Sequence, residues 1–121
     1  MPCQIRLRNN QSYVEATYSG ALKQSELEQA AFKILEFMKE EGTMLLLADC
    51  SDIKGGHSVF DLYALSDWLK ATAPHIKEAV VLPTLPLASE NVKFWETTCR
   101  NRGLMVCIFN DCRSALEWLL A

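Results

Sequence analysis

Apolar residues recur at helical spacing in one long segment of the N-terminal half. From Ser25 to Glu40 they fall at i, i+3, i+4, i+7, i+8 and i+11, as Leu27, Ala30, Ala31, Ile34, Leu35 and Met38. A single stripe of this kind is typical of a helix that packs one face on a core. Ser25 and Glu28 have the spacing of a capping box, and Gly42 follows as a C-terminal cap would. The pattern predicts a helix over 25–40.

Two patterns indicate strands on either side of this helix. Gln4 to Arg8 alternates strictly, and Tyr13 to Tyr18 is rich in strand formers, with turn residues between them and Gly20 closing the second strand. This arrangement predicts a β-hairpin. Short, uninterrupted apolar runs are typical of strands buried on both faces of a parallel sheet. Three such runs follow, at Met44 to Ala48, Ala79 to Leu82 and Leu104 to Phe109.

Three more helices complete the pattern. One is expected from about Ser58 to Ala73, where Pro74 stops it, and another from Pro86 to Arg102. A last helix, capped by Asn110 or Asp111, has Ala115, Leu116, Leu119 and Leu120 on one side. The polar, glycine-containing segment from Asp49 to His57 is expected to be a loop. The order β-β-α-β-α-β-α-β-α predicts an α/β fold with a mainly parallel sheet, and residues 1–121 form a single domain.

Composition narrows the class of protein. The chain has 121 residues, of which 50% are hydrophobic and 22% charged, as in an ordinary globular domain. A net charge of −3 and a pI near 5.3 argue against a nonspecific nucleic-acid binder. The N-terminus lacks the apolar core of a signal peptide, and the run from Met44 to Ala48 is too short to span a bilayer, so we expect a cytoplasmic protein.

Five cysteines without a CxxC spacing, and two histidines far from them, are better explained as reduced, packed thiols than as a zinc site. We therefore expect no metal and no cofactor.

Several short segments, taken in order, carry a family resemblance. They are Tyr18-Ser19-Gly20-Ala21-Leu22, Leu45-Leu46-Leu47-Ala48-Asp49, Phe94-Trp95-Glu96, Asn101-Arg102-Gly103, Val106 to Phe109 and Ala115-Leu116-Glu117-Trp118-Leu119. Over nearly the whole chain they resemble the SpoIIAA-like (STAS/Sec14-type) family. The resemblance implies a superhelical βα fold in which neighbouring strands are adjacent in sequence. Such a sheet lacks the switch-point crevice that binds dinucleotides, and the chain has no G-x-G-x-x-G motif.

The resemblance also implies a regulatory position. Anti-sigma-factor antagonists of the STAS type carry a phosphorylatable serine where the helix after the central strand begins, and this position falls on Ser58. Backbone amides and the helix dipole would favour a phosphate there, although an ordinary N-cap serine is the simpler explanation. Gly55 and Gly56, followed by His57, could form an anion-binding nest or simply a flexible turn.

The segment from Asp49 to Asp61 gathers other polar groups whose chemistry can be weighed. Asp49, Asp52, His57 and Asp61 could supply ligands to a divalent ion, and Cys50 or Ser51 could form a nucleophile with His57 and Asp52. Helix capping and turn formation explain the same residues. We therefore expect no catalytic residue and no enzyme.

Function remains a choice between two binding roles. The resemblance implies a non-catalytic interaction or regulatory module of the anti-sigma-factor-antagonist type, with an unidentified protein partner. Trp68 and Phe94 lie near the margins of their apolar stripes and are candidates for an interface, and a homodimer is one hypothesis for it. The alternative is a Sec14-like protein that binds a lipid or a small apolar molecule, in a pocket that the segment from Leu82 to Leu87 could line.

Overall fold

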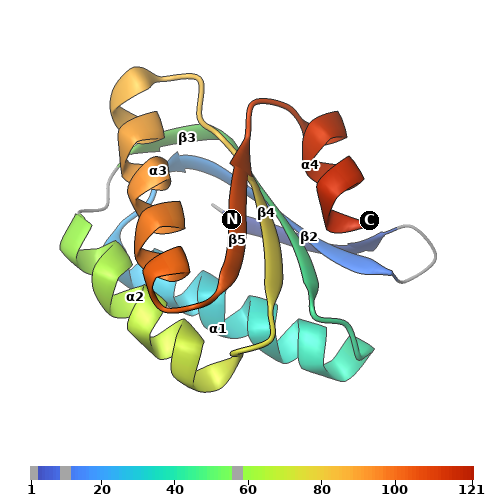
Figure 1. The fold of residues 1–121 in the computed structure, drawn as a ribbon. Helices are drawn as coiled ribbons and strands as arrows, with labels where there is room; N and C mark the ends of the chain where they lie inside the picture. The colour runs from blue at the N-terminus through green and yellow to red at the C-terminus, as the bar shows by residue number, and fades with distance from the viewer. Residues whose placement is uncertain (1–2, 9–11, 56–58) are drawn as a thin grey trace.

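The computed structural model has the order of strands and helices that the sequence predicts. It describes residues 3–8, 12–55 and 59–121, without the side chains of residues 59 and 60. In these ranges the elements are β1 (Cys3–Arg8), β2 (Tyr13–Ala21), α1 (Gln24–Glu41), β3 (Leu45–Gly55), α2 (Val59–Thr72), β4 (Lys77–Val81), α3 (Pro86–Asn101), β5 (Met105–Phe109) and α4 (Cys112–Leu119) (Figure 1).

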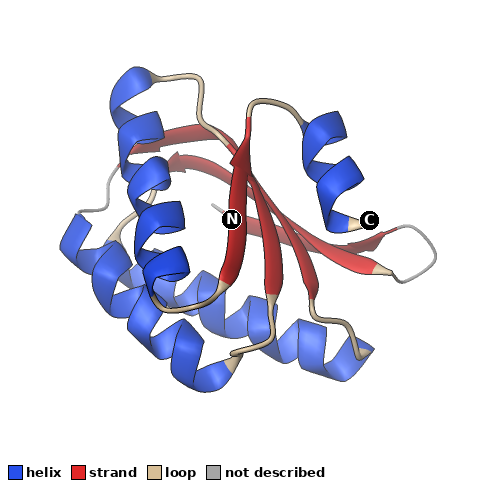
Figure 2. Ribbon diagram, viewed as in Figure 1, coloured by secondary structure: helices blue, strands red, loops and turns tan. Residues whose placement is uncertain are grey.

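The five strands form one sheet in the order β1-β2-β3-β4-β5 (Figure 2). β1 pairs antiparallel with β2, and every later neighbour is parallel. Each strand thus lies beside its neighbour in sequence, which confirms the expected α/β fold. The strand order never reverses, so this sheet has no switch point of the kind that opens a dinucleotide crevice.

The helices divide unequally between the two faces of the sheet. α1, α2 and α3 cover one face, and α4 covers the other (Figure 1). Side chains alternate along a strand, so Leu46 and Ala48 of β3 face the three helices while Leu47 faces α4. Because both faces are covered, β3 is apolar from Leu45 to Ala48 and β4 from Ala79 to Val81.

The expectation of a loop from Asp49 to His57 is wrong, because β3 continues to Gly55. β2 is also long, and its last residues pair with this extension: Ser19 lies opposite Asp52 and Gly20 opposite Ile53, after a shift in register. β4 ends opposite Asp49, so among the described strands the extension pairs with β2 alone. The polar side chains of this extension can therefore reach solvent although they belong to a regular strand. Their polarity alone had suggested a loop.

The predicted capping box of Ser25 and Glu28 is also wrong. α1 begins one residue earlier, at Gln24, which places Ser25 inside the first turn. The carboxylate of Glu26 instead accepts a hydrogen bond of 3.0 Å from the backbone N–H of Lys23. The predicted C-terminal cap is confirmed: Gly42 has φ of 71°, a left-handed conformation that glycine adopts without strain.

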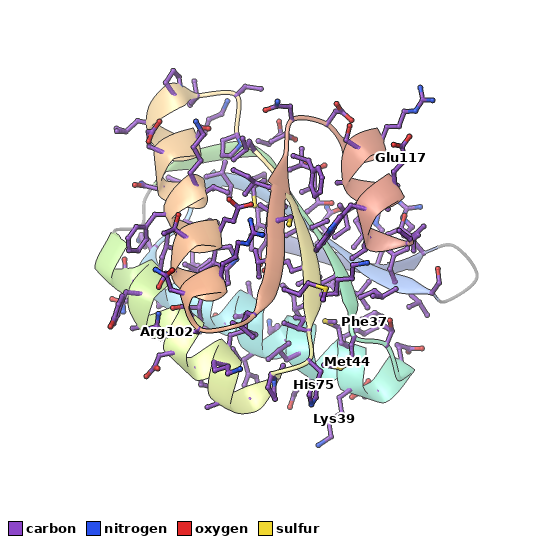
Figure 3. All side chains as sticks on the ribbon, in the orientation of Figure 1. Phe37, Lys39, Met44, His75, Arg102 and Glu117 are labelled. Carbon is purple, nitrogen blue, oxygen red and sulfur yellow. The ribbon has the colours of Figure 1, made fainter. Side chains whose placement is uncertain are left out.

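Polar groups bind α2 to α3. The buried hydroxyls of Ser66 and Thr98 lie 3.1 Å apart, and Arg102 donates a hydrogen bond of 2.8 Å to the Thr98 hydroxyl. The Arg102 guanidinium also lies 4.3 Å from the centre of the Tyr63 ring, on the α2 side of α3 (Figure 3). These contacts hold two of the three covering helices together as one unit.

The start of α4 provides a test of this structure. The Asp111 side chain accepts a hydrogen bond of 2.8 Å from the backbone N–H of Ser114, which is the bond of an N-cap. We expect Asp111→Ala to lower the midpoint of urea denaturation, because the Ser114 N–H loses its acceptor. Asp111→Asn keeps the acceptor and should cost much less; equal losses for the two variants would contradict the cap.

Candidate functional site

A cavity of about 80 Å³ lies between the sheet and its three covering helices. Strands β2, β3 and β4 form its floor, where Ala48 leaves room at the centre. Helices α1, α2 and α3 form its roof through Ile34, Leu62 and Val92, among others. Nearly all of its lining is apolar. We call this space the chamber.

One carboxyl group faces the chamber. Glu78 lies on β4 two residues before Val80 and therefore points to the same face of the sheet. Its side chain is 6% exposed. The indole Nε1 of Trp95, on α3, donates a hydrogen bond of 2.9 Å to Glu78 Oε1. This bond brings an acidic group from the sheet and an aromatic ring from a helix together at the wall of the chamber.

Two polar atoms at the chamber have no hydrogen-bond partner within the part of the chain that the structure describes. They are Glu78 Oε2 and the hydroxyl of Tyr18, a β2 residue that is 8% exposed. Buried polar groups are paired in most proteins, because an unpaired one costs about 1–3 kcal/mol. A pair of unsatisfied groups in one cavity therefore points to a missing partner.

Burial controls the protonation of these groups. Burial raises the pKa of Glu78 to about 7, against a smaller opposing effect of the Trp95 hydrogen bond. Burial also raises the pKa of Tyr18 well above its ordinary value, and the neighbouring Cys3 and Cys50 thiols and the Glu78 carboxyl raise it further. Near neutral pH, Glu78 is thus divided between its charged and neutral forms, while Tyr18 keeps its proton.

A groove on the outer surface lies over the chamber. It has a volume of about 290 Å³ and is lined by Glu28 and Phe32 of α1 and by Ala64, Leu65 and Trp68 of α2. Leu65 and Trp68 line both the groove and the chamber. These two half-buried side chains therefore lie between the chamber and the groove.

A second, more polar hollow lies where β4 and β5 end. It measures about 520 Å³ and is lined by Leu82, Pro83, Thr84, Ser89, Lys93, Ile108, Phe109 and Asn110. The segment from Leu82 to Leu87, which could have lined an apolar pocket, borders this hollow through its first three residues and does not line the chamber. Leu87 is 80% exposed.

The structure bears unevenly on the residues predicted from sequence. Gly55 ends β3, and its carbonyl accepts a hydrogen bond of 2.8 Å from the Leu22 N–H. Gly56, His57 and Ser58 lie outside the described residues, so a phospho-acceptor or anion site there stays a prediction.

The two predicted interface residues are both partly buried. Trp68 and Phe94 pack against the main core, and Trp68 also lines the chamber and the groove. An interface at either residue stays a prediction.

The polar cluster expected after the central strand is divided between the two sides of the sheet. Cys50 is buried on the side of the three helices, and burial raises its pKa well above the ordinary value. Ser51 belongs to the opposite side and donates a hydrogen bond of 2.7 Å to Asp49. Cys50 is therefore a protonated core thiol, apart from these two. Among the described residues, no three acidic, cysteine or histidine side chains gather as metal ligands.

Sequence analysis missed Glu78 and Tyr18. The predicted strand began at Ala79, one residue after Glu78, so Glu78 was not placed on either face of the sheet. The available signal was its two-residue spacing from Val80, since alternation places both on one face of a strand. The partner of Glu78, Trp95, comes from another element seventeen residues along the chain, and local spacing does not reveal such a contact.

Comparisons with known proteins show the fold. No known family matches the sequence, and no curated protein does. Among solved structures, the chain is similar to an uncharacterised protein of the DUF3478 family from Shewanella loihica, described as having a SpoIIAA-like fold. The TM-score is 0.59 at 23% identity, over 97% of this chain and 91% of that one. The chain therefore has a SpoIIAA-like fold, as the resemblance implied. No helix in the described ranges is long and apolar enough to cross a membrane.

The raised pKa of Glu78 makes stability depend on pH. The folded state holds this proton more tightly than the unfolded state, so stability falls as pH rises from about 4.5 to about 7. We expect Glu78→Gln to remove up to about 3 kcal/mol of this loss, as measured by urea unfolding at pH 5 and pH 8.

Glu117→Gln, at a side chain that is 70% exposed, is the matched control and should keep the pH dependence of the natural protein. If Glu78→Gln lost as much stability between the two pH values as the natural protein does, Glu78 would titrate normally.

Proposed function

We propose that this protein is a non-catalytic binding domain whose ligand is a small apolar molecule held in the chamber. The observation that carries the proposal is the chamber itself: a cavity of about 80 Å³ with an almost wholly apolar lining, between the sheet and three helices. Most ligand sites are concave and mainly apolar, with a few polar groups that fix orientation. The chamber has this composition, with Glu78, Tyr18 and Trp95 among its polar groups.

The size of the chamber limits what fits. An engineered apolar cavity of about 150 Å³ accepts benzene. A space of about 80 Å³ therefore suits a short aliphatic chain. A longer ligand would extend into the groove between α1 and α2, which adds about 290 Å³ once Leu65 or Trp68 moves aside.

The energetic cost of the chamber supports a role beyond incomplete packing. An empty cavity costs about 24 cal/mol per Å³, so about 80 Å³ costs about 2 kcal/mol. Ala31 on the roof and Ala48 on the floor are both small residues, and a larger side chain at either would reduce the cavity. A binding function explains why the core keeps this space.

The chemistry of the lining supports binding over catalysis. Its ionisable groups are Glu78, Tyr18 and Cys50, and burial raises the pKa of each. Near neutral pH the hydroxyl and the thiol are protonated and are weak nucleophiles.

A regulatory role of the STAS type remains a second candidate, with the fold as its support. Its predicted switch residue, Ser58, is outside the described residues. A homodimer through Trp68 or Phe94 belongs to the same hypothesis. Sedimentation that showed only monomer at micromolar concentration would remove the dimer.

Filling the chamber tests the binding function. Ala48→Leu adds three carbon atoms at the floor of the chamber, so we expect it to abolish binding of 1-butanol. Binding would be followed in the natural protein by methyl chemical shifts of Ile34, Leu46 and Val80, which line the chamber. Five non-hydrogen atoms bind weakly at best, so millimolar titration is appropriate.

Ala71→Leu, at an exposed position of α2, is the matched control and should bind 1-butanol as the natural protein does. Urea unfolding of both variants would show that they are folded. No saturable shift in the natural protein, or equal binding by folded Ala48→Leu, would overturn the proposal.

A further inference from the structure

Each of the two unpartnered groups of the chamber has an oxygen that can accept a hydrogen bond, and the Tyr18 hydroxyl can also donate one. Glu78 Oε2 accepts hydrogen bonds when the carboxyl is ionised, and the Tyr18 hydroxyl oxygen has free lone pairs. Trp95 already occupies Oε1 with its N–H. A head group with several donors can therefore serve the Glu78 carboxylate and the Tyr18 hydroxyl oxygen at the same time.

The charge of the lining selects among such ligands. Among the described residues, the chamber has Glu78 as its acid and no lysine, arginine or histidine. An anionic head group, such as a carboxylate or a phosphate, would meet a like charge in a region of low dielectric constant and would find no cation. A cationic head group would find an opposite charge there. The chamber therefore disfavours fatty acids, although its lining is apolar.

Aromatic side chains strengthen the preference for a cation. Tyr18, Trp68 and Trp95 all contribute to the lining. Aromatic rings attract ammonium groups through their electron-rich faces, and sites for such groups often combine several rings. Three aromatic residues and one carboxyl group on the wall of a single cavity are a suitable set for an ammonium group.

We propose that the ligand of the chamber is an organic cation, a primary amine with a short apolar chain, whose ammonium group binds Glu78 and Tyr18. This inference rests on the proposed binding function and adds the chemical class of the ligand. The three N–H donors of the ammonium group serve Glu78 Oε2 and the Tyr18 hydroxyl oxygen. The alkyl chain lies among the apolar side chains of the sheet and of α1.

Binding of a cation has a consequence that binding of a neutral molecule lacks. An ammonium ion beside Glu78 favours the ionised carboxylate and so lowers its pKa from about 7. Amine binding should therefore release a proton from Glu78 and strengthen as pH rises from 5 to 8. Binding of a neutral alcohol should not strengthen in this way, since an alcohol brings no charge.

Three ligands of nearly equal size separate the possibilities: n-butylammonium, 1-butanol and butyrate, each titrated at pH 8 and followed by methyl chemical shifts. We expect n-butylammonium to bind at least about tenfold more tightly than 1-butanol, and butyrate not to bind. Glu78→Gln should weaken n-butylammonium by at least about tenfold and leave 1-butanol within about threefold. Tyr18→Phe keeps the ring and removes the hydroxyl, so it should weaken the amine by a smaller factor.

The outcomes distinguish this inference from the proposed function. Binding of 1-butanol with no preference for the amine, or an amine affinity unchanged in Glu78→Gln, would overturn the inference and leave the binding function standing. Binding of butyrate as tightly as n-butylammonium would also overturn it. If none of the three bound while the protein was folded, the inference and the binding function would both fail.

Discussion

The hydrogen bond from Trp95 to Glu78 joins helix α3 to the middle of the sheet and places a carboxyl group inside the core. A buried carboxyl is costly, and one hydrogen bond to Oε1 offsets the cost only in part. The consequences extend through the chamber: burial raises the pKa of Glu78 to about 7, and the cavity acquires a centre for a donor ligand. Among the described residues of the lining, no cationic side chain accompanies Glu78, so the carboxyl favours a ligand that carries a positive charge.

The strand order explains where the chamber forms. Because each strand lies beside its neighbour in sequence, the crossovers through α1, α2 and α3 all fall on one face, and only α4 covers the other. Three helices over one twisted face leave a space beneath them when a floor residue is as small as Ala48. The hydroxyl and guanidinium contacts of Ser66, Thr98 and Arg102 hold α2 to α3, whereas α1 and α2 border a groove. Leu65 and Trp68, which line both the chamber and the groove, therefore lie at the border between α1 and α2.

Local patterns predicted the architecture but not the chamber. The stripe from Leu27 to Met38 predicted α1 to within about a residue at each end, because the buried residues of an amphipathic helix recur every three or four positions in the sequence. The extension of β3 to Gly55 was missed because pairing with β2 stabilises it while its side chains are polar. Glu78 was missed for a related reason: its burial depends on Trp95 and on helices distant in sequence. Tertiary contacts, which have no local period, determine both features.

A crystal structure of the protein grown with n-butylammonium would test the central claim most directly. The account predicts electron density for the amine in the chamber, with its nitrogen within hydrogen-bonding distance of Glu78 Oε2 and its carbon chain between Ile34 and Val80. A chamber that held only ordered water, hydrogen-bonded to Glu78 and Tyr18 at a saturating concentration of the amine, would contradict it.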